Sequence, residues 1–133
     1  VTNPKDIKGF IKILRAQPFT VITGVNTLFN ALMNNSELST VDFSALRLSL
    51  GGGMTVQRDV AERWKKQTKV ALVEAYGLTE TSPAACINPL DLKDYNGTVG
   101  LPLPSTSVKV IDEEGKELSI AKESINTDAT SKN

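Results

Sequence analysis

Three short apolar runs, spaced evenly along this 133-residue chain, constrain its fold more than any other feature. Residues 19–23, 46–50 and 70–75 are rich in β-branched and other apolar side chains, as buried strands are. They begin about 26 residues apart, which leaves room for one helix between consecutive strands. Strands joined through a helix pair in parallel by right-handed crossovers. The sequence therefore predicts an α/β fold, with a partial parallel sheet and flanking helices.

The segments around these strands have the period of amphipathic helices. Asn3 and Pro4 predict the start of the first helix, as N-cap and first helical residue. Thr55 is the predicted N-cap of a helix over residues 55–68. The first two helices have apolar stripes with i, i+3, i+4, i+7 spacing. These stripes are Ile7, Phe10, Ile11 and Leu14 in the first helix, and Val25, Leu28, Phe29 and Leu32 in the second.

Glycine or a polar turn follows each predicted strand. Gly24 ends the first strand, Gly51–Gly53 follows the second, and Tyr76 follows the third. The carboxyl ends of parallel strands lie at one edge of the sheet, where open α/β sheets bind their ligands. We therefore expect these segments to converge on one site.

The remainder of the chain has a different character. Residues 84–87 predict a short strand and residues 97–102 an extended segment punctuated by glycine and proline. Residues 107–112 alternate as a half-buried strand does, and residues 113–116 predict a hairpin turn with glycine for a positive φ. Residues 119–133 form a polar tail, predicted to be disordered.

Composition excludes several classes of protein. Fifteen basic and fifteen acidic residues cancel, so bulk charge does not point to nucleic acid or to a membrane surface. Without histidine, imidazole catalysis and histidine metal sites are excluded within these residues. The single cysteine, Cys86, forms no internal disulfide and fits a reducing compartment. No apolar run approaches the roughly 20 residues of a membrane helix, and no signal peptide opens the chain.

The segment after the third strand carries the groups that a nucleotide site needs. Tyr76 offers a ring face for a base, Thr79 a hydroxyl for phosphate, and Glu80 a hard oxygen for Mg²⁺. Gly51–Gly53 allows close approach of the backbone to a ligand. No lysine follows these glycines at P-loop spacing, which favours contact with a flat group over a triphosphate.

Each of these residues also has a structural interpretation. Tyr76 is equally consistent with a core aromatic at a strand end, and Thr79 with a residue that caps a turn. Alone, Gly51–Gly53 would be interpreted as a tight strand-to-helix turn with no ligand. Alone, Glu80 would be interpreted as a solvated loop carboxylate. Cys86 is interpreted as a small buried side chain, and Trp64 as helix packing. The convergence of several such groups at one sheet edge is what favours a ligand site.

The motifs resemble those of the adenylate-forming superfamily of acyl-CoA synthetases, luciferases and peptide-synthetase adenylation domains. Residues 76–80, Tyr-Gly-Leu-Thr-Glu, match its Y-G-x-T-E motif. Residues 23–32, 51–54, 88–89 and 100–106 also resemble bacterial long-chain fatty-acid–CoA ligases. The resemblance covers about residues 3–118.

The resemblance implies a two-step ligase. A fatty acid attacks ATP to give acyl-adenylate and pyrophosphate, and CoA then displaces AMP. It implies that Tyr76 packs on adenine, with Gly77 in the same nucleotide motif, while Thr79 contacts phosphate and Glu80 binds Mg²⁺. Thr79 and Glu80 would be the catalytic residues. Backbone at Gly51, Gly52 and Gly53 would pass adenine and the start of the acyl tunnel, which Val25 and Leu28 would help to line.

The resemblance also implies that the chain is part of a larger domain. A phosphate loop upstream, and a ribose-binding aspartate and catalytic lysine downstream, are expected of the family and do not occur in these residues; the chain begins with Val1 rather than Met. We assign residues 1–106 to the N-terminal adenylate-forming domain, 107–118 to a following β segment, and 119–133 to a tail unlike the family. The isolated chain is expected to be inactive.

The remaining expectations concern partners and place. Fatty acid, ATP and CoA are the expected ligands, the rest of the parent domain is the expected protein partner, and nucleic acid is not expected. The expected location is the cytoplasm, with contact at the inner membrane and self-association left open. Two alternatives also stay open: an adenylate-forming ligase for another carboxylic acid, and a non-catalytic remnant that serves as an interaction module.

Overall fold

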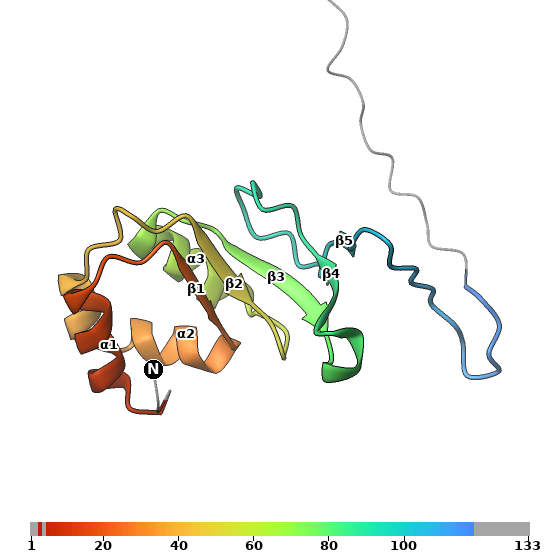
Figure 1. The fold of residues 1–133 in the computed structure, drawn as a ribbon, viewed down its shortest axis with the longest axis horizontal. Helices are drawn as coiled ribbons and strands as arrows, with labels where there is room; N and C mark the ends of the chain where they lie inside the picture. The colour runs from red at the N-terminus through yellow and green to blue at the C-terminus, as the bar shows by residue number, and fades with distance from the viewer. Residues whose placement is uncertain (1–2, 4, 119–133) are drawn as a thin grey trace, which may run out of the picture.

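The computed structural model describes residue 3 and residues 5–118, and its ribbon is a sheet with helices packed on it (Figure 1). Pro4 and the predicted polar tail lie outside the described residues. The elements in chain order are α1 (Ile7–Ala16), β1 (Val21–Gly24), α2 (Asn26–Met33), η1 (Ser36–Thr40), β2 (Leu48–Gly51), α3 (Arg58–Thr68), β3 (Leu72–Gly77), η2 (Thr79–Thr81), β4 (Ala84–Ile87) and β5 (Leu101–Pro102).

The five strands form one sheet in the order β1-β2-β3-β4-β5. β1 pairs with β2, and β2 with β3, in parallel, as the strand–helix–strand pattern predicts. β4 and β5 extend the sheet as antiparallel strands. The prediction of an α/β fold with a partial parallel sheet is confirmed.

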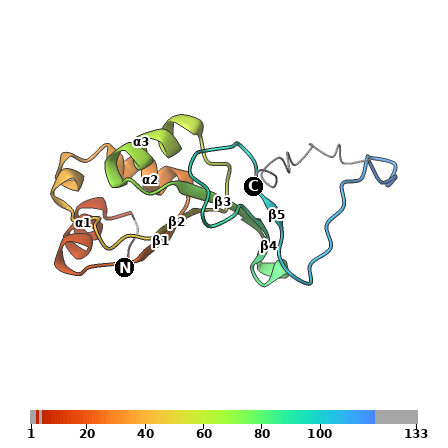
Figure 2. The same cartoon turned by 90° about the horizontal axis from the view of Figure 1, so that it is seen from above.

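The hydrophobic core lies between the helices and one face of the sheet. α2 and α3 lie on the same side of the strands (Figure 2). On that face Ile22, Ser49 and Leu72 are register partners across three strands, and all three are buried. Trp64 of α3 packs edge-on against Phe29 of α2, with ring centroids 4.8 Å apart. The opposite face is less covered, since Val21 of β1 is exposed.

Two helices begin later than the sequence predicts. α1 begins at Ile7, where Asp6 is the N-cap and its side chain accepts a hydrogen bond from the Gly9 N–H. α3 begins at Arg58, and its N-cap Gln57 makes no side-chain cap, so the prediction of Thr55 as N-cap is wrong. The N–H groups of Val56 and Gln57, which would be the first two of a helix capped by Thr55, are bound instead by acceptors distant in the sequence.

The segment after β5 is more exposed than its alternating sequence predicts. Val108, Val110 and Ile111 are exposed, and Ile111 bridges only to Glu117. The predicted half-buried strand at residues 107–112 is wrong, because no other described element covers this hairpin (Figure 1). The predicted hairpin turn at residues 113–116 is confirmed, with Gly115 at φ 81°.

Within residues 5–118, no helix combines the length and apolar character that a membrane crossing requires.

Candidate functional site

The carboxyl ends of the three parallel strands meet at one edge, as predicted. Gly24 of β1, Gly51 of β2 and Glu74 of β3 are register partners across the sheet. The N–H of Gly52 donates to the carbonyl of Gly24 at 3.1 Å, which extends the ladder beyond β2. This edge therefore brings the predicted glycines next to the segment that enters Tyr76.

The turn between β2 and α3 projects at this edge, and we call residues 51–56 the glycine loop. A Cβ on Gly53 would lie 3.3 Å from Val25, and one on Gly52 would lie 3.4 Å from the carbonyl oxygen of Ala75. The loop thus runs between the segment that follows β1 and the end of β3. Gly53 has φ 74°, a backbone conformation that glycine adopts without strain.

Tyr76 lies beside this loop and is not a core residue. Its side chain is 49% exposed, although the residue pairs with Cys86 across β3 and β4. This exposure is not that of a core aromatic, and it leaves the side chain accessible to a ligand at the carboxyl edge. Met54 and Leu78 are exposed apolar neighbours along the chain. The edge therefore presents an open, partly apolar surface.

Thr79 and Glu80 lie in η2, the turn that follows β3. Both side chains are exposed, and neither makes a hydrogen bond within the described residues. The turn is held instead by Thr81, whose hydroxyl accepts from the Leu78 N–H at 2.9 Å and lies 2.7 Å from the carbonyl oxygen of Pro83. Thr81 is a structural residue that sequence reasoning missed. It leaves Thr79 and Glu80 available to a ligand.

Gly77 has a steric role that its motif does not reveal. A Cβ at this position would overlap the carbonyl oxygen of Pro83 on the returning chain. The glycine is therefore required where η2 folds back on β3, independently of any ligand. It lies in the site as part of the turn that presents Thr79 and Glu80.

The two predicted acyl-contact residues have different surroundings. Val25 is 40% exposed and lies against the glycine loop. Leu28 is half-buried and packs against the hydrophobic core, and its Cδ2 lies 2.8 Å from where a Cβ on Gly24 would be. Val25 is thus accessible to a ligand at the carboxyl edge, whereas Leu28 packs against the core.

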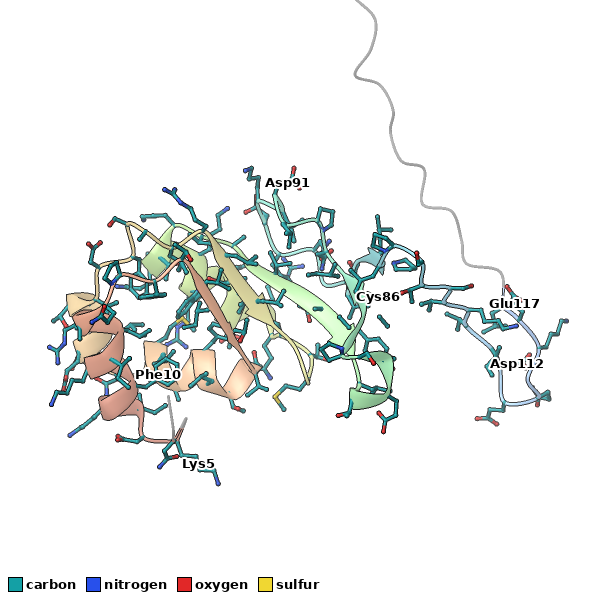
Figure 3. All side chains as sticks on the ribbon, viewed as in Figure 1. Lys5, Phe10, Cys86, Asp91, Asp112 and Glu117 are labelled. Carbon is teal, nitrogen blue, oxygen red and sulfur yellow. The ribbon has the colours of Figure 1, made fainter. Side chains whose placement is uncertain are left out.

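Two buried polar residues lie behind this edge and are joined by a hydrogen bond from the Asn88 N–H to the Glu74 carbonyl, and their burial was not predicted from the sequence. Glu74 is 5% exposed, and its Oε1 accepts from the Val56 N–H at 2.9 Å. Asn88 is also buried, and its Oδ1 accepts from Asn96 at 2.7 Å and from the Thr98 hydroxyl at 3.2 Å. A glutamate inside the apolar run at residues 70–75 was the available indication, because a buried charge needs a partner. Cys86, which is labelled in Figure 3, lies on β4 and is buried, as predicted.

The AMP-binding enzyme family matches residues 1–123 of this sequence. The chain belongs to the AMP-binding enzyme family. It is 57% identical over 122 residues to a long-chain-fatty-acid–CoA ligase of Yersinia pestis, which covers 92% of this chain and 22% of the relative. It is 56% identical over 119 residues to the enzyme of the same name from Escherichia coli O157:H7, covering 90% of this chain and 21% of that protein. The chain thus spans about one-fifth of the length of these relatives.

Solved structures agree on the fold of this AMP-binding chain. An anthranilate CoA ligase in complex with anthranoyl-AMP superposes with a TM-score of 0.79 at 23% identity, covering 88% of this chain and 22% of that one. ATP-bound MatB from Rhodopseudomonas palustris has a TM-score of 0.72 at 33% identity, covering 87% of this chain and 23% of MatB. The elements described above therefore form part of an adenylate-forming enzyme domain.

The carboxylates of this AMP-binding chain fit a Mg²⁺ site that is shared with substrate phosphates. Across residue 3 and residues 5–118, no group of three or more Asp, Glu or Cys residues could hold a metal ion. Mg²⁺ in proteins is commonly held by one or two carboxylates together with substrate phosphates. The exposed Glu80 carboxylate fits that role, while an all-protein metal cage among the described residues does not.

Proposed function

We propose that this chain forms part of the nucleotide and acyl site of a long-chain fatty-acid–CoA ligase. The parent reaction joins a fatty acid to ATP to give acyl-adenylate and pyrophosphate, and CoA then displaces AMP to give acyl-CoA. One observation carries the proposal: a chain 57% identical to a relative of that name brings the glycine loop and residues 76–80 together at one sheet edge. The full reaction is proposed for the longer protein, since these residues correspond to 22% of that relative.

The nucleotide part of the proposal rests on two surfaces. The exposed ring of Tyr76 would stack on adenine. The backbone of Gly51, Gly52 and Gly53, with no side chain in the way, would pass along the base. Gly77 would contribute by allowing the tight return that places the following residues.

Thr79 and Glu80 would act on the phosphates. The Thr79 hydroxyl would donate a hydrogen bond to a phosphate oxygen, and the Glu80 carboxylate would supply one ligand to Mg²⁺. A bound Mg²⁺ would neutralise phosphate charge. Thr81 keeps the turn in place, so that both side chains face solvent rather than the core.

The acyl part rests on Val25, with Leu28 behind it. Val25 lies against Gly53, so an alkyl chain beside the base would meet apolar surface there. The parent would take CoA as second substrate and work in the cytoplasm, with contact at the inner membrane for an apolar substrate. The single cysteine fits that reducing compartment.

The division of the chain follows from the same proposal. Residues 1–106 would belong to the N-terminal adenylate-forming domain and residues 107–118 to the β segment that follows, with the tail from residue 119 unlike the family. The exposed face of β1 and the exposed hairpin would then pack against the rest of the parent domain, or self-associate in its absence.

Calorimetric titration with a non-hydrolysable long-chain acyl-adenylate analogue tests the site. Saturable binding by the 133-residue chain, lost in a Tyr76→Ala, Glu80→Ala double variant and kept in a Val110→Ala, Glu113→Ala control on the exposed hairpin, is the expected result. A well-folded wild-type chain that binds no analogue would contradict the proposal and favour the non-catalytic remnant. Acyl-CoA formation by the chain alone is expected to be absent, and ligase-like turnover would contradict that expectation.

A ligase for another acid remains the alternative activity. The apolar neighbours at the edge, Val25, Met54 and Leu78, favour an alkyl substrate over a small polar one. Offering short-chain, aromatic and long-chain acids to the full-length parent separates the two. Preference for an aromatic or short acid would overturn the long-chain assignment while leaving the adenylate-forming chemistry in place.

A further inference from the structure

The first and last residues of the glycine loop, Gly51 and Val56, lie against each other. A Cβ on Gly51 would lie 2.5 Å from Cγ2 of Val56, so the backbone of the first residue and the side chain of the last are in contact. The residues between them project at the carboxyl edge of the sheet. The conformation of this projecting part therefore depends on how firmly Val56 is held.

Three side chains from three separate parts of the chain hold Val56 and its neighbour. Oε1 of Glu74 on β3 accepts from the Val56 N–H at 2.9 Å, and the Tyr95 hydroxyl donates to the Val56 carbonyl at 2.9 Å. Oδ1 of Asn26, at the start of α2, accepts from the Gln57 N–H at 3.0 Å. Both backbone polar groups of Val56 are thus bound by side chains rather than by a regular helix or sheet.

Glu74 is the notable member of this set, because a buried carboxylate is costly unless it is hydrogen-bonded. It is 5% exposed and lies in register with Gly51, directly under the loop. Its partner N–H belongs to the turn that precedes α3, whose N-cap has no side-chain cap of its own. The hydrogen bond that Glu74 accepts therefore stabilises this particular loop conformation.

We propose that Glu74 is a positioning residue of the nucleotide site, which acts by holding Val56 and thereby fixing the glycine loop. This inference rests on the proposed function. Asn26 and Tyr95 assist it, while Glu74 itself touches no substrate. Its carboxylate points to the loop backbone on the helix-covered face, and the loop residues Gly52 and Gly53 face the ligand.

Amide hydrogen exchange by NMR tests the anchoring without any ligand. Glu74→Met keeps the length of the side chain and removes the acceptor, whereas Glu74→Gln keeps an acceptor oxygen. We expect the Val56 amide to exchange about tenfold faster or more in the methionine variant, with the glutamine variant close to wild type. Glu113→Met, on the exposed hairpin turn, is the control and should leave Val56 unchanged.

ATP titration of the same variants, followed at the Gly52 and Gly53 amides, tests the link to the site. We expect about tenfold weaker binding in Glu74→Met, near-normal binding in Glu74→Gln, and a smaller loss in Tyr95→Phe. Where Glu74→Met fails to fold, Glu74→Asp, whose shorter side chain withdraws the acceptor from the Val56 N–H, decides the question by its Val56 exchange. Unchanged Val56 exchange in Glu74→Met or Glu74→Asp, or a uniform increase across α3 and β3, would overturn the proposal.

The exchange measurement and the ATP titration together distinguish a failure of the positioning role from a failure of the proposed function on which it rests. A wild-type chain with a protected Val56 amide but no ATP binding would contradict the nucleotide site and leave Glu74 as the anchor of the loop. ATP binding that is equal in wild type and Glu74→Met would contradict the positioning role and leave the proposed function intact.

Discussion

The indole N–H of Trp64 donates to the hydroxyl of Ser49 at 2.9 Å, and both side chains are completely buried. The bond joins the centre of α3 to β2, the strand that leads into the glycine loop and the middle one of the three parallel strands. Trp64 also packs edge-on against Phe29 and Phe43. The helix layer is therefore joined to the sheet by one specific polar contact within an apolar core.

Ser49→Ala should destabilise the chain by about 1–3 kcal/mol, because the buried indole N–H would lose its acceptor. Urea unfolding followed by tryptophan fluorescence measures the change directly. Ser107→Ala, at an exposed position outside the strands, is the control and should lie within about 0.5 kcal/mol of wild type. Equal stabilities of Ser49→Ala and wild type would show that the bond contributes nothing.

Gly77→Ala should be among the most destabilising single changes in the site. Its Cβ would overlap the Pro83 carbonyl oxygen, so the junction of β3 with η2 must open, at an expected cost above about 2 kcal/mol. Gly97→Ala provides the comparison. It has a positive φ of 71° but only ordinary contacts with Tyr95, and should cost about 1 kcal/mol. Thermal unfolding of both variants would contradict this account if Gly97→Ala were the more damaging.

Glu80→Gln should remove the benefit of Mg²⁺ for ATP binding while leaving the metal-free affinity nearly unchanged. The amide has the shape of the carboxylate but lacks the charge that a hard cation prefers. Titrations of ATP with and without MgCl₂ give the two affinities. Glu113→Gln, on the exposed hairpin turn, should retain the full Mg²⁺ effect. Retention of that effect in Glu80→Gln would remove Glu80 from the metal role.

Asp42 provides a pH-dependent test away from the site. The Ser44 backbone N–H, bonded to Oδ1 at 2.9 Å, holds the pKa of the Asp42 carboxyl below its ordinary value of 3.8, and the Ser44 hydroxyl lowers it further. A carboxyl whose pKa is depressed by folding stabilises the fold above its unfolded pKa, and this contribution is lost as the pH falls through the folded pKa. An NMR titration should find the Asp42 pKa below 3.8 in the wild type and higher in Ser44→Ala. Equal values would contradict the hydroxyl contribution.

Much of the site could be placed from the sequence because its placement depends on topology. The spacing of residues 19–23, 46–50 and 70–75 determined parallel pairing, and parallel pairing determines that Gly24, Gly51 and Tyr76 end at one edge. The position of this edge needs no side-chain detail. The roles of Thr79 and Glu80 came from a resemblance and remain proposals.

Other features were decided only by tertiary contacts. Thr55 has the chemistry of an N-cap, but Glu74 and Asn26 already bind the N–H groups of Val56 and Gln57, so α3 begins at Arg58. A sequence shows local donors and acceptors, whereas these partners are 18 and 31 residues away.

Burial is the last property that the sequence left open. Residues 107–112 alternate as a half-buried strand does, yet they are exposed because alternation requires a neighbouring surface to bury its apolar side. Glu74 shows the converse, since a carboxylate in an apolar run became buried where a backbone N–H could satisfy it. The sequence by itself thus determined the order of elements and the sheet edge at which the candidate site lies. The tertiary structure decided which polar groups at this edge find hydrogen-bond partners, because those partners are distant in the sequence and meet only on folding.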